Sequence, residues 1–103
     1  MSKKNIKMVS ASTLHNVEVR ESQADRILKE KRGVLILENN GHQYQKGDRI
    51  MFNVIEDNIH LECVSHDLRR QLYVVTNVYS GRGIEPGYVV LLIDYGGPIC
   101  EEV

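Results

Sequence analysis

From residue 33 onward, turn signals divide the chain into short runs of aliphatic and β-branched residues. These runs are 34–37, 49–54, 72–79 and 88–93. In the second run, Ile50, Phe52 and Val54 occupy alternate positions, and this period of two indicates a strand with one buried face. The first run is short and continuously apolar, which predicts a strand buried on both faces. A chain divided in this way favours a sheet over a helical bundle.

The region before residue 33 contains the one convincing helix. Ser22 resembles the start of a capping box, because its hydroxyl can accept a backbone N–H of the first turn. Ala24, Ile27 and Leu28 then follow at helical spacing. After the basic run 29–32, Gly33 is expected to close the helix.

Two further segments complete the predicted strands. Residues 14–20, before the helix, alternate in polarity and read as a strand. Its inward residues are expected to be Leu14 with Val17 or Val19. Asp57 and Asn58 offer a hairpin turn into another strand. Its inward residues are expected to be Ile59, Leu61 and Cys63.

Six or so short strands with one or two short helices predict an α+β, mainly β fold, a small closed barrel. Closure is expected because it leaves no strand with an unpaired edge. At 103 residues the chain has the size of one domain. We expect one core over residues 14–95 and flexible ends at 1–11 and 96–103.

The charge of the chain is nearly balanced but unevenly distributed. The formal net charge is −1, which argues against coating nucleic acid or membrane through bulk electrostatics. Residues 1–52 carry ten Lys or Arg and six Asp or Glu, a balance of +4, whereas 53–103 carry three and eight, a balance of −5. A basic patch able to contact a few phosphates is compatible with this asymmetry.

Several classes of protein are not expected from this sequence. It has no membrane-spanning apolar run and no signal-peptide core, so a soluble, cytoplasmic protein is expected. Cys63 and Cys100 form no paired motif, which suits a reduced compartment and predicts no disulfide between them. The four histidines lack ligand spacing and no nucleotide-binding fingerprint occurs, so neither a metal nor another cofactor is expected.

Three segments together resemble the ASCH branch of the PUA-like superfamily, in particular its small bacterial and phage proteins. They are 15–31, a strand opening with His15 followed by the helix; 44–50, Tyr-Gln-Lys-Gly-Asp-Arg-Ile; and 75–91, two strands around a glycine loop with Glu-Pro-Gly-Tyr. The resemblance covers about residues 14–95. It implies a PUA-like barrel, work on nucleic acids or nucleosides, and a pocket between the helix and the barrel.

Some ASCH proteins hydrolyse an acylated cytidine through a Lys, a Thr and a Glu. Lys31 stands at the position of that lysine, but Gly33 stands where the threonine would follow. Leu35 and Leu37 replace the polar residues of the usual Glu-x-Arg. The resemblance therefore favours a module that binds RNA, or another nucleic acid or nucleotide, without catalytic activity. A nucleoside amidohydrolase and a protein-interaction barrel are the alternatives.

Candidate nucleic-acid-binding residues follow from charge and from the resemblance. Basic side chains suit phosphate contacts, and the loop 80–87 has the length of a functional loop. The resemblance places a histidine at the mouth of the family pocket. The candidates are Lys31, Arg32, Arg49, Arg82 and His15. Three or four phosphate contacts would give RNA binding a log–log salt slope of about −2 to −3. The protein is expected to be a monomer.

Overall fold

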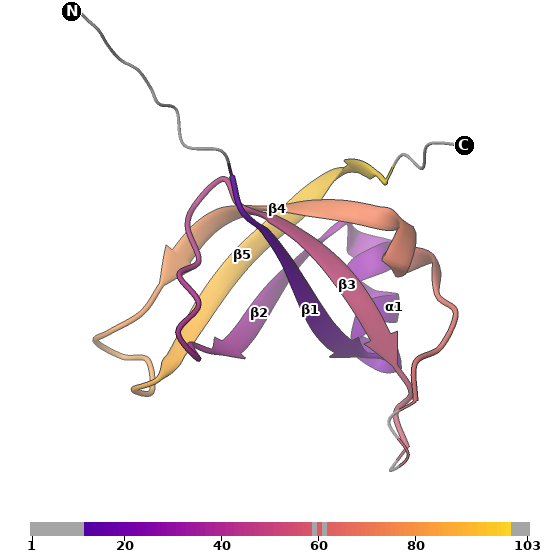
Figure 1. Ribbon diagram of the computed structural model, residues 1–103, viewed down its shortest axis with the longest axis horizontal. Coiled ribbons are helices and arrows are strands. Elements are labelled where there is room, and N and C mark those ends of the chain that lie inside the picture. The colour runs from indigo at the N-terminus through magenta and orange to yellow at the C-terminus, as the bar shows by residue number, and fades with distance from the viewer. Residues whose placement is uncertain (1–11, 59, 61, 100–103) are drawn as a thin grey trace, which may run out of the picture.

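The computed structural model describes residues 12–58, 60 and 62–99. Five strands form one mainly antiparallel sheet in the order β1-β3-β4-β5-β2, and the sheet curls into a half-barrel (Figure 1). The elements in chain order are β1 (Leu14–Arg20), α1 (Glu21–Glu30), β2 (Arg32–Glu38), β3 (Arg49–Ile55), the 3₁₀ helix η2 (Asp67–Arg70), β4 (Gln71–Tyr79) and β5 (Tyr88–Pro98). The mainly β architecture with one or two short helices is confirmed.

The sheet is open between its two ends, β1 and β2. β1 pairs only with β3, in parallel, and β2 pairs only with β5, antiparallel, among the described residues. The sequence predicted about six strands in a closed barrel, so the strand count and the closure differ from that prediction. The difference arises after Asp57, where the expected strand contributes only an isolated bridge between Ile55 and Cys63.

The core lies on the concave face of the sheet. The alternation of Ile50, Phe52 and Val54 is confirmed, because all three are buried. Tyr73 is fully buried among them, and its hydroxyl donates to Oε1 of Gln71 at 2.8 Å. Burial, with the nearby Tyr95, raises the pKa of Tyr73 to about 12. Helix α1 packs against one end of this face (Figure 1) and adds two residues to the core. These are Ala24 and Ile27.

The inward faces of β1 and β2 differ from the prediction. In β1 the buried residues are His15, Val17 and Val19, whereas Leu14 is 46% exposed. The parity expected for Leu14 was therefore wrong, and a histidine takes the inward position beside a carboxylate.

In β2, Leu35 is buried, but Val34 and Ile36 are 56% and 68% exposed. The continuous apolar run is thus buried on one face only, because no further layer covers the outer face of β2 among the described residues.

Both ends of α1 also differ from the prediction. The residue at the N-cap is Arg20, and the Ser22 hydroxyl donates to Asp57 instead of capping. The helix ends at Lys31, whose φ of 61° is left-handed and whose N–H donates to the Ile27 carbonyl. Gly33 lies within β2, where an added Cβ would sit 3.1 Å from Ile27. Close packing between strand and helix, and not helix termination, accounts for that glycine.

The region around the two cysteines departs from the prediction as well. Cys63 is exposed and free, not a buried apolar residue, and its sulfur accepts from the Asn53 amide. Residues 59 and 61, predicted to share its parity, lie outside the described residues, as does Cys100.

The β4–β5 connection and the end of β5 complete the sheet. Gly87 has φ 87°, and the Tyr88 N–H donates to the Glu85 carbonyl, so residues 85–88 form the turn that a Pro-Gly pair favours. β5 continues to Pro98, past the expected core limit at 95. Of the helices in the described part of the chain, none has the length and apolarity needed to cross a membrane.

Candidate functional site

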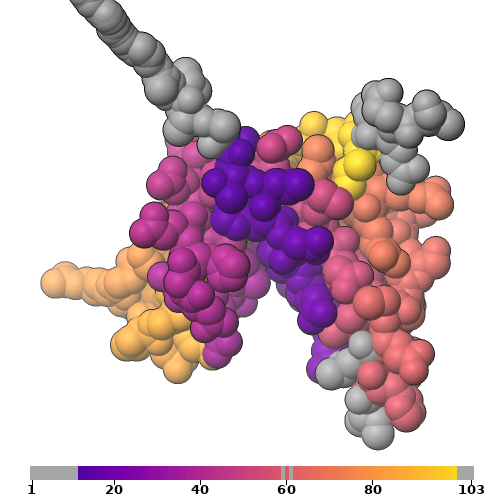
Figure 2. Space-filling model, in the orientation of Figure 1, coloured from indigo at the N-terminus to yellow at the C-terminus, as the bar shows by residue number. Residues whose placement is uncertain are grey.

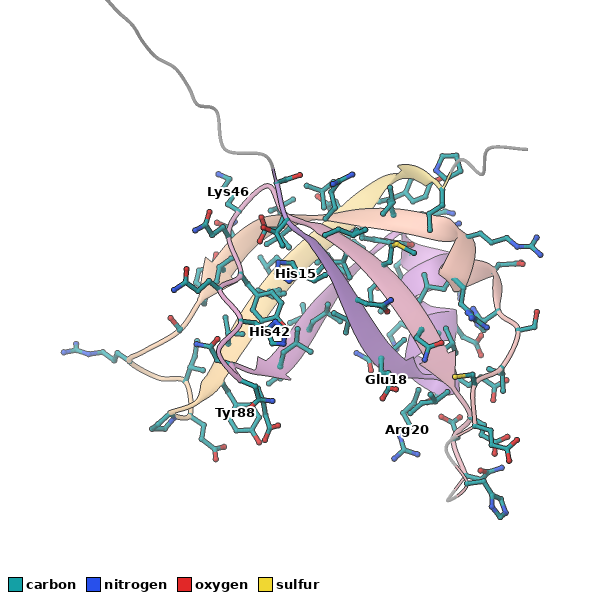
Figure 3. The ribbon with its side chains drawn as sticks, in the orientation of Figure 1. His15, Glu18, Arg20, His42, Lys46 and Tyr88 are labelled. Carbon is teal, nitrogen blue, oxygen red and sulfur yellow. The ribbon has the colours of Figure 1, made fainter. Side chains whose placement is uncertain are left out.

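The connection from β2 to β3, residues 39–48, runs beside β1 and brings three rings together. The His15 and Tyr44 ring centroids are 4.5 Å apart. The His42 ring lies 5.7 Å from that of Tyr44 and 6.3 Å from that of His15. His15 and His42 therefore lie on the same side of the half-barrel, as Figure 3 shows, although the sequence separates them widely.

Asp48 holds this group of rings in place. Its Oδ2 lies 2.7 Å from Nε2 of His15, and both side chains are buried. The same carboxylate accepts the backbone N–H groups of Thr13 at 3.2 Å and Gln45 at 3.0 Å. Gly47, with φ 96°, supplies the turn that positions Asp48 directly before β3. One carboxylate thus joins β1, the connection and β3.

The electrostatics of Asp48 follow from these contacts. Burial alone would raise the pKa of the carboxyl, but the hydrogen bonds from His15, Gln45 and Thr13, together with attraction to His15, leave that pKa below its ordinary value. A carboxylate accepts and does not donate, so Nε2 of His15 carries the proton in this bond. Nδ1 can accept a hydrogen bond only when the ring is neutral, because a protonated ring donates from both nitrogens.

A cavity of about 610 Å³ opens beside the rings. Its lining combines aromatic faces with amide and backbone polar groups and includes no Lys or Arg. It is formed by Thr13, Leu14, His15, Asn16, Gly41, His42, Gln43 and Tyr44.

A second hollow of about 300 Å³ shares Asn16, His42 and Tyr44 with this cavity and continues between the edges of β1 and β2. Figure 2 shows the surface hollowed between these two parts of the chain. The second hollow adds Glu18 and Glu38, whose carboxylates can accept hydrogen bonds.

Lys31 and Arg32 lie at another place, the junction of α1 and β2. Nζ of Lys31 sits 4.6 Å from the ring centroid of Tyr95. Arg32 lines a groove of about 470 Å³ between α1 and the β2–β5 part of the sheet. The resemblance implied a pocket between the helix and the barrel with a histidine at its mouth, but His15 does not line this groove. Glu30 and Asp94 line the same groove, so its charges are mixed.

Arg49 and Arg82 lie at two further places. Arg49 begins β3 opposite Leu14 of β1, and its Nε donates to the Ser12 hydroxyl at 3.1 Å. Its backbone N–H donates to the carbonyl of Thr13, a residue of the cavity. Arg82 is exposed on the loop between β4 and β5. The backbone of Arg49 therefore lies beside the His15 cavity, but its side chain is not among the residues that line this cavity. The structure does not gather the four basic candidates into one cleft.

Sequence reasoning found His15 but missed His42, Tyr44 and Asp48 as its partners. The segment 44–50 entered only as part of the ASCH resemblance. Its signal was the turn Gln45-Lys46-Gly47-Asp48, which places a carboxylate one residue before a strand predicted to be buried. Within the described ranges no group of three or more His, Cys, Asp or Glu is placed to hold a metal ion.

No family model matches the chain, and no curated protein matches it either. The ASCH resemblance therefore rests on the residues quoted for it and stays a prediction.

Proposed function

We propose that the protein binds single-stranded RNA, or another nucleic acid or nucleotide, by receiving a base in the cavity beside His15, and that it does so without catalysing a reaction. The observation that carries the proposal is the group of His15, His42 and Tyr44 rings, with centroids 4.5 to 6.3 Å apart, at the wall of an open cavity. Unpaired bases are bound by stacking on such rings. A PUA-like identity for the half-barrel belongs to the same proposal.

The hydrogen-bonding groups around the cavity suit the edge of a base. Asn16 and Gln43 each offer an amide that can donate and accept, and Nδ1 of His15 can accept when its ring is neutral. Because Asp48 fixes the His15 ring, this acceptor is oriented before a ligand arrives. Preorganisation of this kind lowers the entropic cost of binding.

The charges near the cavity favour a nucleoside or a short unpaired segment over a long polyanion. Arg49 is joined to the cavity through Thr13, whereas Lys31 and Arg32 lie at the groove under α1. The alternative of an amidohydrolase gains no support from the geometry. Lys31 lies over the ring of Tyr95, and Leu35, at a position where the family has a polar residue, is buried in the core.

The proposal is tested by replacing Tyr44 and a matched tyrosine. We expect Tyr44→Ala to weaken binding of labelled single-stranded RNA by roughly 1–3 kcal/mol, about 5- to 150-fold, the range for one stacked base. Tyr79→Ala removes an exposed tyrosine at the end of β4, outside the lining of the cavity, and should leave the affinity unchanged.

Amide chemical shifts of the full chain, titrated with RNA and with a panel of nucleosides, locate the site independently. We expect the shifted amides to cluster at residues 13–16 and 41–44. Equal losses for Tyr44→Ala and Tyr79→Ala would contradict the proposal. So would the absence of shifts at these residues with millimolar ligand.

A further inference from the structure

The edge of β2 that faces away from β5 carries backbone groups without a strand partner among the described residues. The Tyr95 N–H donates to the Lys31 carbonyl, and the Asn39 N–H donates to the Gly87 carbonyl. Because hydrogen-bonded and non-hydrogen-bonded pairs alternate in an antiparallel ladder, the odd-numbered residues of β2 bond to β5. The N–H and C=O groups of Arg32, Val34, Ile36 and Glu38 therefore point to the free edge.

The side chains of these four residues are also exposed. Val34 and Ile36 are aliphatic and 56% and 68% exposed, and they lie side by side at the centre of the strand. Arg32 and Glu38, of opposite charge, stand at its two ends. An exposed edge with an apolar centre is a template for pairing with another strand.

The sequence of β2 is complementary to itself in the antiparallel direction. With Leu35 on a twofold axis, Arg32 of one copy faces Glu38 of the other, and Val34 faces Ile36. The dimer then contains two Arg32–Glu38 pairs, and the four aliphatic side chains form one continuous strip. The same register places the free N–H and C=O groups of the even-numbered residues opposite each other, for about eight backbone hydrogen bonds.

We propose that this edge pairs with β2 of a second copy of the chain, so that two half-barrels share one continuous sheet. A symmetric interface formed by the same patch on both copies is the commonest form of homodimer. The proposal replaces the monomer expected from the sequence. It does not depend on the RNA-binding proposal, because the rings of His15, His42 and Tyr44 are not among the pairing residues. Ile36 and Glu38 do line the second hollow, so the interface would border the candidate site.

The first experiment measures molar mass by sedimentation or light scattering over a range of micromolar to millimolar concentrations. We expect the wild-type mass to rise toward twice that of the monomer. Ile36→Lys should stay monomeric, because two lysines would enter the apolar strip. Leu14→Lys is the matched control, since Leu14 is an exposed aliphatic residue on the other edge strand, β1. This variant should dimerise like the wild type.

The second experiment tests the register. Arg32→Glu alone and Glu38→Arg alone should each be monomeric, because each places like charges opposite each other twice. An equimolar mixture of the two variants should form a heterodimer, in which both pairs are again of opposite charge. Amide exchange gives a further readout, because the Val34 and Ile36 amides should become protected only in the dimer.

A wild-type protein that stays monomeric at millimolar concentration overturns the proposal. A dimer that Ile36→Lys leaves intact, or a mixture of the two charge variants that forms no heterodimer, overturns it as well. If the wild type is monomeric but binds RNA, the dimer proposal fails and the proposed function stands.

Discussion

The two edge strands of the sheet, β1 and β2, expose opposite kinds of side chain beside their free edges. Within the part of the chain that the structure describes, each pairs with one neighbour only, so each has a free edge there. On the exposed face of β1, Asn16, Glu18 and Arg20 follow Leu14, whereas β2 exposes Val34 and Ile36 at its centre. Charged edge side chains discourage strand pairing and an apolar edge invites it.

On the inward faces the difference is reversed, because the polar residue is in β1 and the apolar residues are in β2. β1 buries a polar residue, His15, which Asp48 holds from the position directly before β3. β2 buries Leu35, with Leu37 half-buried. The polar group inside β1 builds the candidate site, and the apolar groups outside β2 build the candidate interface. In each strand, the residues that break the alternation of apolar inside and polar outside lie in a proposed functional surface. His15 lies at the proposed base-binding cavity, and Val34 and Ile36 lie in the proposed dimer interface.

The largest expected effect tests whether β2 is held in the monomer by its inner face alone. Leu35 is 1% exposed, so Leu35→Ala should lower the free energy of unfolding by about 2–5 kcal/mol, through lost burial and the cavity left behind. Urea denaturation at low micromolar concentration, where association is weakest, measures this change.

Ile36→Ala is the matched change on the outer face of the same strand. Since Ile36 is largely exposed, we expect an effect within about 0.5 kcal/mol under these conditions. A loss for Ile36→Ala as large as that for Leu35→Ala would show that the outer face of β2 is covered in the monomer, and the contrast between the two edges would disappear.

A smaller effect is expected at the polar anchor of β1. Asp48→Asn leaves the partners of a buried carboxylate poorly satisfied and should cost about 1–3 kcal/mol at neutral pH. The pKa of Asp48 is lowered on folding, so its stabilisation is complete above the ordinary value of 3.8 and is lost as the pH falls through the lower, folded value.

Urea denaturation between pH 6 and pH 2.5 checks this sign. The wild type should lose more stability over this interval than Asp48→Asn, because the variant has already lost the titrating group. Asp94→Asn, a change at an exposed aspartate of β5, should keep the wild-type pH dependence. If the free energy of unfolding fell in parallel with pH for the wild type and for Asp48→Asn, Asp48 would not be the residue that anchors β1.

The sequence predicted local structure better than it predicted what each strand packs against. The alternation in 49–54 was correct, because it depends on nearby residues only. The inward position of His15 depends on Asp48, which lies 33 residues away, and polarity alone assigned Leu14 to the core instead. The exposure of Val34 and Ile36 could not be read from an apolar run, since a run does not reveal whether a second layer covers it.

The candidate site shows the same limit. His15 was identified through resemblance to a family, but His42 and Tyr44 reach it through a connection whose path no local pattern specifies. Charge was a poor guide for a related reason. Lys31, Arg32, Arg49 and Arg82 are all exposed, and only the course of the chain determines whether exposed charges share a surface.

The smallest expected effect separates the basic residues of the two edges. Arg49 adjoins β1 and the cavity, whereas Arg32 begins β2 and lines the groove under α1. If RNA binds at the cavity, Arg49→Ala should flatten the log–log dependence of affinity on salt by about 0.7, the value for one phosphate contact of a single strand. Arg32→Ala should leave the slope unchanged.

Because the four cations do not converge, the wild-type slope itself should lie near −0.7 to −1.4, which corresponds to about one or two phosphate contacts. The sequence predicted about −2 to −3, the slope expected when the four cations act together. Titration of labelled RNA at several salt concentrations measures all three slopes. A change for Arg32→Ala without one for Arg49→Ala would move the nucleic-acid site from β1 to the groove between α1 and β2.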